Sequence, residues 1–240
     1  YPGSIENQLG IDKSSNGLRV RCGIIAIVST LPVPTYLAVF AAALLLALVL
    51  TPLAGRLGRR WGLVDRPGGR RAHRGEIPRT GGIALFGAFT GTLLLAFLLF
   101  PAWLPPSTDP NETTRLAGLL LGSTVAFGFG LLDDKRELSW RGQISVQVLC
   151  AAIAIVTLIF IERVNNPFTN AQIVFPDLVV WTLTTFWFLG AMNTLNWLDG
   201  LDGLAAGVTA ILAAVLVGHM LWRADPPQLS VAILPLALLG

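Results

Sequence analysis

The stretch DLVVWTLTTFWFLGAMNTLNWLDGLDGLAAG, residues 177–207, joins an apolar run to a regular polar motif. About fifteen mostly apolar residues precede four polar ones, each three positions after the last, and a second apolar run follows: Asn193, Asn196, Asp199 and Asp202. A helix that crosses a bilayer needs about 20 mostly apolar residues. Polar side chains in such helices usually face a bundle interior or a water-filled cavity. The stretch therefore predicts a membrane-spanning helix that ends in a polar site.

The composition of the whole chain favours the same class of protein. Of its 240 residues, 53% are hydrophobic and only 13% are charged, which is too apolar for an ordinary soluble domain. Cys22 and Cys150 provide no disulfide framework. We expect an all-α, polytopic transmembrane helix bundle. A polar, irregular extracytoplasmic lead-in would occupy 1–33, and a C-terminally incomplete transmembrane domain would occupy 34–240. This domain would have a truncated seventh span from about 229 and six complete spans: 34–54, 81–100, 115–132, 143–161, 177–195 and 204–223.

Basic residues predict which side of the bundle faces the cytoplasm. The loop 55–80 carries eight arginines, and the loop 133–142 adds Lys135, Arg136 and Arg141, so these two loops hold 11 of the 17 basic residues. Such loops remain on the cytoplasmic side of a membrane. Three polar clusters, at 65–82, 130–138 and 193–204, all fall on this side, which indicates a common site. Tryptophans mark the predicted span ends: Trp61, Trp103, Trp140, Trp197 and Trp222.

The first cluster to carry chemistry is the acidic pair Asp133 and Asp134. Adjacent carboxylates at a membrane boundary repel each other and are costly to dehydrate, and a divalent cation would offset that repulsion. Mg²⁺ typically takes one or two carboxylates together with phosphate oxygens. A solvated acidic loop, neutralised by Lys135 and Arg136, explains the pair equally well when it is considered alone.

The other two clusters also have plain explanations. A helix that ends in Asp-Gly turns before a new span begins would account for Asp199 and Asp202, although not for the deeper Asn193 and Asn196. The arginines of the loop 65–82 are partly a topology signal. They also suit an anion-binding loop, because arginine grips phosphate bidentately and helix N-termini such as Gly81 and Gly82 favour phosphate. Taken together, the clusters predict a cytoplasm-facing cleft that binds metal and phosphate at the membrane surface, as phosphoryl transfer to a lipid would require.

Three ordered motifs carry a resemblance to a known family. GLVDRPGGRRAHRGEIPRTGGIAL at 62–85, GLLDDKREL at 130–138 and NTLNWLDGLDGLAAG at 193–207 resemble motifs of the polyprenyl-phosphate N-acetylhexosamine-1-phosphate transferases, the integral-membrane glycosyltransferase family 4. The first motif resembles the UDP-N-acetylglucosamine branch. The resemblance covers about residues 34–240.

The resemblance implies roles for individual residues. The catalytic residues would be Asp133, Asp134, Asp199 and Asp202, with Asp133 and Asp134 also holding Mg²⁺ or, as an alternative, Mn²⁺. Six further residues would bind the substrate: Asp65, Arg71, His73, Arg79, Asn193 and Asn196.

The implied reaction moves a sugar-1-phosphate, GlcNAc-1-phosphate in this branch, from a UDP-sugar to undecaprenyl phosphate and releases UMP. It would serve cell-envelope polysaccharide synthesis, such as lipopolysaccharide or peptidoglycan, in the bacterial inner membrane. The expected partners are the UDP-sugar, the lipid phosphate, membrane lipid and a second copy in a homodimer, with no nucleic acid. Two alternatives stay open: phospho-MurNAc-pentapeptide transfer, and a non-catalytic lipid-phosphate binder or transporter.

The sequence departs from the family pattern in two places. Glu137 stands where many relatives have a third aspartate, and no Gly-Asp dipeptide occurs where the family's later metal-binding motif would be sought. The chain ends at Gly240 within an apolar run, so a fragment with an incomplete metal site is expected.

Overall fold

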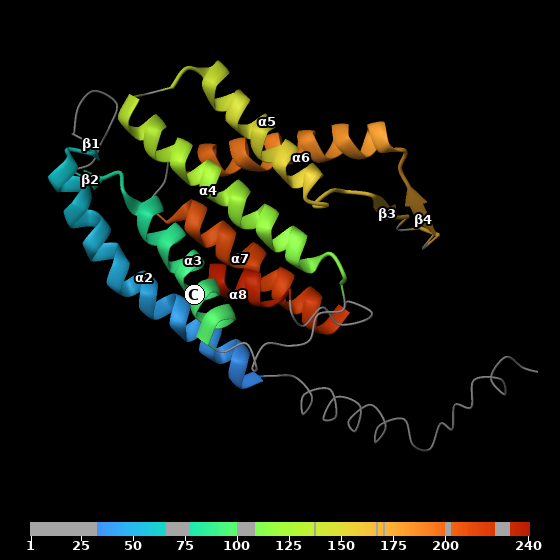
Figure 1. The fold of residues 1–240 in the computed structure, drawn as a ribbon, viewed down its shortest axis with the longest axis horizontal. Helices are drawn as coiled ribbons and strands as arrows, with labels where there is room; N and C mark the ends of the chain where they lie inside the picture. The colour runs from blue at the N-terminus through green and yellow to red at the C-terminus, as the bar shows by residue number, and fades with distance from the viewer. Residues whose placement is uncertain are drawn as a thin grey trace, which may run out of the picture.

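The computed structural model describes residues 33–65, 77–99, 109–136, 138–166, 168–169, 171–199, 203–223 and 231–240. These residues form a bundle of helices, which confirms the predicted all-α membrane architecture (Figure 1). The helices are α2 (Val33–Trp61), α3 (Gly81–Leu99), α4 (Glu112–Arg136), α5 (Trp140–Val156), α6 (Asp177–Leu198), α7 (Leu204–Gly218), the π-helical turn η3 (His219–Arg223) and α8 (Ile233–Leu239).

Five of these helices have the length and apolar composition of membrane spans: Val33–Trp61, Gly81–Leu98, Glu112–Arg136, Asp177–Leu198 and Leu204–Leu221. The sixth predicted span corresponds to α5, which is apolar but only 17 residues long. The start of the seventh corresponds to α8, which has seven residues. The count of six complete spans and a seventh therefore stays a prediction.

The bounds of α5 differ from the predicted span 143–161. The helix begins at Trp140, after Ser139 in an extended conformation, and it ends at Val156. Its end is set by Leu158, whose φ of 63° lies in the left-handed region. The Ile159 amide then donates to the Ala154 carbonyl at 2.8 Å, and the Leu158 amide donates to Ile155 at 3.1 Å. This turn closes the helix five residues before hydropathy alone would end it, because backbone conformation and not apolarity decides where a helix stops.

The exterior of the bundle is apolar over much of its height. Leu98 on α3, Phe186 and Trp187 on α6 and Leu48 on α2 are each more than 60% exposed. In water such a surface would promote association. In a bilayer the hydrocarbon chains solvate it, and the helices satisfy their own backbone hydrogen bonds.

The main apolar core joins α2, α3 and α8. Tyr36 and Val39 of α2 pack with Leu93 of α3 and with Ile233 and Leu236 of α8. Because α8 packs on α2 as well as on α7, it holds the C-terminal part of the chain against the first described helix. Figure 1 shows α8 between α3 and α7.

Two short antiparallel hairpins were not predicted from the sequence. β1 (Val64–Asp65) pairs with β2 (Ile77–Pro78), and β3 (Arg163–Asn165) pairs with β4 (Gln172–Val174). Before β1, α2 ends at Trp61. The next residue, Gly62, has a φ of 70°, and the amides of Gly62 and Leu63 donate back to the carbonyls of Arg59 and Gly58. This is the Schellman pattern, which favours glycine at the left-handed position. It turns the chain directly from α2 into β1.

Gly118 marks the closest approach of α4 to the end of α5. A Cβ at this position would collide with the side chain of Thr157, including its Oγ1 and Cβ atoms. We expect Gly118→Ala to destabilise the bundle by about 1–3 kcal/mol, because overpacking forces neighbouring atoms to shift. Thermal unfolding in detergent micelles, followed by tryptophan fluorescence, would report this as a lower apparent midpoint.

Gly128→Ala is the matched control on the same helix, since no atom lies within 4 Å of the added Cβ. Alanine has the better helix propensity, so this variant should unfold at or above the wild-type midpoint. Equal midpoints for the two variants would contradict the close α4–α5 contact at Gly118.

Candidate active site

Asp134, in the acidic pair, interacts with one charged residue from each of the other two polar clusters. This residue lies in the last turn of α4 and is partly buried. Its carboxylate interacts electrostatically with the Arg79 guanidinium and with the carboxylates of Asp133 and Asp199. Arg79 precedes α3 and Asp199 follows α6, so the three residues come from three distant parts of the sequence. These residues therefore interact across the three motifs, while the common site itself stays a prediction.

Arg79 is placed by the hairpin and by the start of α3. Its amide donates to the Leu63 carbonyl at 3.0 Å, which extends the β1–β2 pairing by one residue. The next residue, Thr80, is 1% exposed, and its hydroxyl donates to the Ala54 carbonyl of α2 at 2.7 Å. These contacts tie the backbone at residues 79 and 80 to α2. Figure 1 shows β1 and β2 at the same end of the bundle as the C-terminus of α4.

Asp133 differs from Asp134 in its contacts. Its Oδ1 accepts a hydrogen bond from the Leu138 amide at 2.7 Å, and its Oδ2 accepts one from Gln143 Nε2 at 3.3 Å. Both oxygens are thus used in closing the turn between α4 and α5. Asp134 faces the charged residues of other segments, whereas Asp133 organises the local turn.

The amides and the carboxylate at the end of α6 lie at different depths. Asn193 is half-buried and forms two hydrogen bonds with Gln147 of α5, at 3.0 and 3.2 Å. Its Nδ2 also donates to the Leu189 carbonyl at 2.8 Å. Asn196 and Asp199 are exposed at the end of the helix, with Asp199 as its C-cap. The motif is therefore anchored at Asn193 and accessible at Asn196 and Asp199.

Several predicted site residues cannot be placed. Asp65 lies in β1, paired with Ile77, but its side chain is not among those described. The other predicted site residues outside the described ranges are Arg71, His73 and Asp202.

The charges around Asp134 determine what this end of the bundle can bind. Asp134 is partly buried and interacts with the carboxylates of Asp133 and Asp199 and with the Arg79 guanidinium. Within the described part of the chain, no three acidic, histidine or cysteine side chains converge as a metal cage. Mg²⁺ does not require one, because it usually takes one or two carboxylates and completes its shell with water and phosphate oxygens. Asp134 and Asp199 interact electrostatically, and their carboxylates are of the donor type that Mg²⁺ takes.

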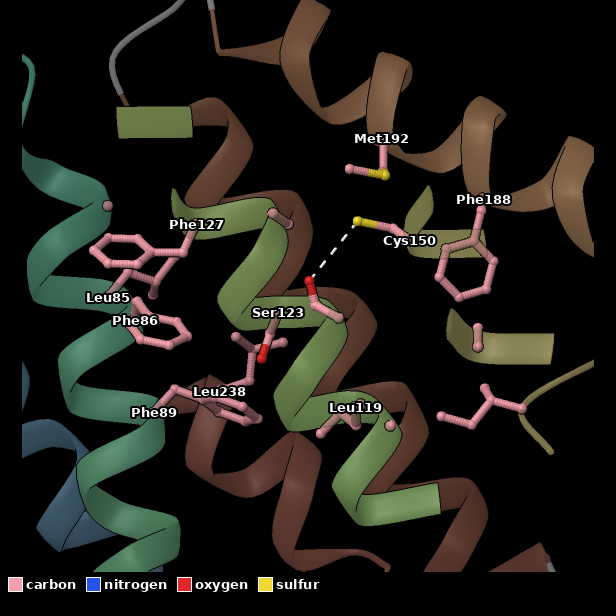
Figure 2. A pocket seen from close by; sticks show the side chains of 16 residues that line it. Leu85, Phe86, Phe89, Leu119, Ser123, Phe127, Cys150, Phe188, Met192 and Leu238 are labelled. Carbon is pink, nitrogen blue, oxygen red and sulfur yellow. Dashed lines mark hydrogen bonds between the residues drawn. The ribbon is translucent and has the colours of Figure 1, made fainter. Parts of the chain in front are cut away.

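An apolar pocket of about 520 Å³ lies between the helices below this end of the bundle. It begins at Gly82, three residues after Arg79, and it includes Met192, which adjoins Asn193. Figure 2 shows Phe86, Phe89 and Phe127 on one side and Cys150, Phe188 and Met192 on the other. The rings of Phe86 and Phe127 stack with centroids 4.3 Å apart. The lining is almost wholly apolar, which suits hydrocarbon and not a sugar or a nucleotide.

Comparison with known families identifies the group to which this architecture belongs. The model of a family described as glycosyl transferase family 4 matches residues 116–240, which include the acidic pair and the Asn/Asp motif. The chain belongs to glycosyl transferase family 4. The first resembling motif, at 62–85, lies before the matched region.

Curated relatives match this family 4 protein at moderate identity. It is 31% identical, over 72% of its length and 44% of the relative's, to a probable undecaprenyl-phosphate N-acetylglucosaminyl 1-phosphate transferase of Bacillus subtilis. It is 28% identical, over 78% of its length and 49% of the relative's, to the undecaprenyl-phosphate alpha-N-acetylglucosaminyl 1-phosphate transferase of Escherichia coli K12. It is 27% identical, over 87% of its length and 52% of the relative's, to a decaprenyl-phosphate N-acetylglucosaminephosphotransferase of Mycobacterium tuberculosis. The chain spans about half the length of these relatives.

The sequence-based site omitted two residues that contact it in this family 4 protein. Gln143 and Gln147 of α5 hydrogen-bond to Asp133 and Asn193. Their signal was present in the sequence, as two amides one helical turn apart in the apolar segment GQISVQVLC. Residues four apart share a helix face, so this spacing points both side chains in a similar direction.

Proposed function

We propose that the protein transfers GlcNAc-1-phosphate from UDP-GlcNAc to undecaprenyl phosphate and releases UMP. The observation that carries this proposal is the meeting of Arg79, Asp134 and Asp199, from three separate motifs, at one end of a membrane bundle. Membership of glycosyl transferase family 4 and the names of the relatives support the sugar and the lipid acceptor. The chain spans about half the length of those relatives.

The reaction is a displacement at the sugar-linked phosphorus. An oxygen of the lipid phosphate forms a new P–O bond to that phosphorus, and the bond from the phosphorus to the oxygen bridging the two phosphates breaks. UMP leaves with the bridging oxygen and its electron pair, and the products are UMP and a lipid diphosphate sugar. A phosphate monoester is already largely ionised near pH 7. Positioning and charge stabilisation can therefore supply most of the catalysis.

The site residues would have two kinds of partner, the anionic phosphates of the UDP-sugar and a divalent cation. Arg79 would bind phosphate oxygens of the UDP-sugar through its planar guanidinium. Asp134 and Asp199 would hold Mg²⁺, with Mn²⁺ as the alternative, and the ion would offset the negative charge of the diphosphate. Asp133 would support the turn that presents Asp134, in addition to its predicted metal role. The roles of five further residues stay predictions: Asp65, Arg71, His73, Asn196 and Asp202.

The apolar pocket supports a lipid as one of the two substrates. Its lining includes Gly82 and Met192, each close in sequence to a motif residue, and is otherwise mostly apolar side chains of the bundle helices. A phosphate held at Arg79 could thus have its hydrocarbon chain in the bundle. The domain of 34–240 would lie in the bacterial inner membrane, as a monomer or homodimer, with this charged end in the cytoplasm as the arginine count predicts.

The test uses the complete natural protein in vesicles that contain undecaprenyl phosphate. We expect UDP-GlcNAc and Mg²⁺ to yield UMP and undecaprenyl diphosphate GlcNAc in equal amounts, measured by liquid chromatography and mass spectrometry. Vesicles without undecaprenyl phosphate are the control and should yield no UMP. Turnover of UDP-MurNAc-pentapeptide alone would assign the other transferase reaction. Saturable binding of lipid phosphate with no UMP from either sugar nucleotide would assign a binder.

A further inference from the structure

The placement of α5 explains how the two catalytic motifs are held at a fixed separation. The acidic pair lies on α4 and the Asn/Asp motif lies on α6. Among the described residues, α4 packs on α5 and α5 packs on α6, while direct packing between α4 and α6 is minor. The distance between Asp134 and Asp199 therefore depends on how each outer helix sits against α5.

Two glutamines of α5 contact the two motifs. Gln143 donates from Nε2 to Asp133 Oδ2 at 3.3 Å, toward α4. Gln147 exchanges two hydrogen bonds with Asn193, toward α6. Gln147 is 8% exposed, and a buried amide is costly in an apolar helix unless it is paired. The contacts with Asn193 satisfy it.

These hydrogen bonds occupy the amide group of Asn193, which leaves it little capacity to bind substrate directly. Its Nδ2 has two protons, and they are donated to Gln147 Oε1 and to the Leu189 carbonyl. Its Oδ1 accepts from Gln147 Nε2. A substrate hydrogen bond from Nδ2 would have to break one of these contacts. Asn196 and Asp199, three and six residues further along, are exposed and have no such restriction.

We propose that Gln143 and Gln147 are positioning residues that set the separation of the two motifs across α5, with Asn193 acting as the partner of Gln147. This inference rests on the proposed transferase function. Leu138, held by the same Asp133 carboxylate, fixes the turn that leads from α4 into α5. About one turn after Gln147, Cys150 of α5 contacts α4, because its Sγ donates to the Gly122 carbonyl at 3.8 Å. Figure 2 shows Cys150 close to Met192 of α6.

The test compares turnover with the separation of the helices in the complete natural protein. Gln147→Leu removes the amide pair, and the reciprocal swap Gln147→Asn with Asn193→Gln restores two facing amides. We expect Gln147→Leu to lower kcat about ten-fold with KM for UDP-GlcNAc within about two-fold, because small displacements of catalytic groups reduce rate more than binding. The swap should recover most of that loss. Ser145→Leu, at an exposed position of the same helix, is the matched control and should keep wild-type kcat.

Electron paramagnetic resonance between spin labels gives the structural readout. Labels at the exposed positions Phe129 of α4 and Trp187 of α6, with Cys22 and Cys150 replaced by alanine, report the distance between the two helices. We expect a broader or shifted distance distribution in Gln147→Leu and a wild-type distribution in the swap. Should Gln147→Leu fail to reach the membrane, the swap decides: retained activity supports positioning, and lost activity with wild-type distances overturns it.

Three results would overturn the inference. One is wild-type kcat in Gln147→Leu, and another is an unchanged distance distribution in a Gln147→Leu protein that has lost activity. The third is a swap variant as inactive as Asn193→Leu with wild-type distances, which would mean that Asn193 acts on the substrate. If the wild-type protein releases no UMP, the proposed function fails instead. The distance distributions then decide the positioning role by themselves.

Discussion

Asp134→Asn should lower the rate of UMP release by the complete protein about 10³-fold or more, equivalent to about 4 kcal/mol of transition-state stabilisation. Asparagine has nearly the same shape but no charge, so the variant loses the carboxylate that interacts with Arg79, Asp133 and Asp199. A divalent cation bound there would lose an anionic ligand, and the diphosphate would keep its uncompensated charge. The measurement is steady-state UMP release in undecaprenyl phosphate vesicles, with the amount of folded protein in the membrane determined in parallel.

Asp177→Asn is the matched control, because Asp177 lies in the first turn of α6, at the opposite end of the helix from Asp199. It should retain wild-type turnover. If Asp134→Asn also retains turnover while folded, Asp134 is not part of the catalytic site, and the catalytic reading of this cluster fails.

Arg79→Ala should lower kcat/KM for UDP-GlcNAc about 10²-fold, mainly through a higher KM. The guanidinium is the one described cation that interacts with Asp134, and its loss removes both the proposed phosphate ligand and an opposite charge beside the carboxylates. Arg79→Lys should recover only part of the affinity, because an ammonium group does not bind two oxygens in the same plane. Initial rates over a range of UDP-GlcNAc concentrations separate KM from kcat.

Arg141→Ala is the control for a general loss of positive charge at this end of the bundle. Arg141 is exposed and lies over the Trp140 ring at 5.2 Å, away from the contacts of Asp134. Its variant should differ from wild type by less than about two-fold, as expected for an exposed charge. Equal losses in the Arg79 and Arg141 variants would point to a diffuse electrostatic effect and against a specific phosphate contact.

The sequence predicted most of the helices because apolar runs mark the segments that cross a bilayer and charged residues mark the loops between them. The segments of α2, α3, α4, α6 and α7 were evident as apolar runs, and Trp61 and Trp140 do lie at helix ends. The end of α5 was missed because it depends on the left-handed conformation of Leu158, which no apolar pattern encodes. The hairpin β1–β2 was missed because strands of two residues have no periodicity to detect.

The sequence predicted which residues belong to the candidate site, but not which of them contact one another. The grouping of Arg79, Asp134 and Asp199 followed from topology, since the three motifs fall on one side of the membrane. The difference between Asp133 and Asp134 did not, because adjacent carboxylates look alike in a sequence and only their hydrogen bonds separate them. Gln143 and Gln147 were passed over because an amide in an apolar run has many plain explanations.

The β1–β2 hairpin has a consequence for how such proteins can be redesigned. Val64 pairs with Pro78 and Leu63 accepts from the Arg79 amide, so the two ends of segment 66–76 are joined at a fixed spacing on the bundle. A loop whose ends are already joined can change length at little cost, because each doubling adds only about 0.6 kcal/mol of closure entropy. Residues 66–76 could therefore be exchanged for the corresponding residues of a relative as a cassette, while Arg79 and the helices keep their places.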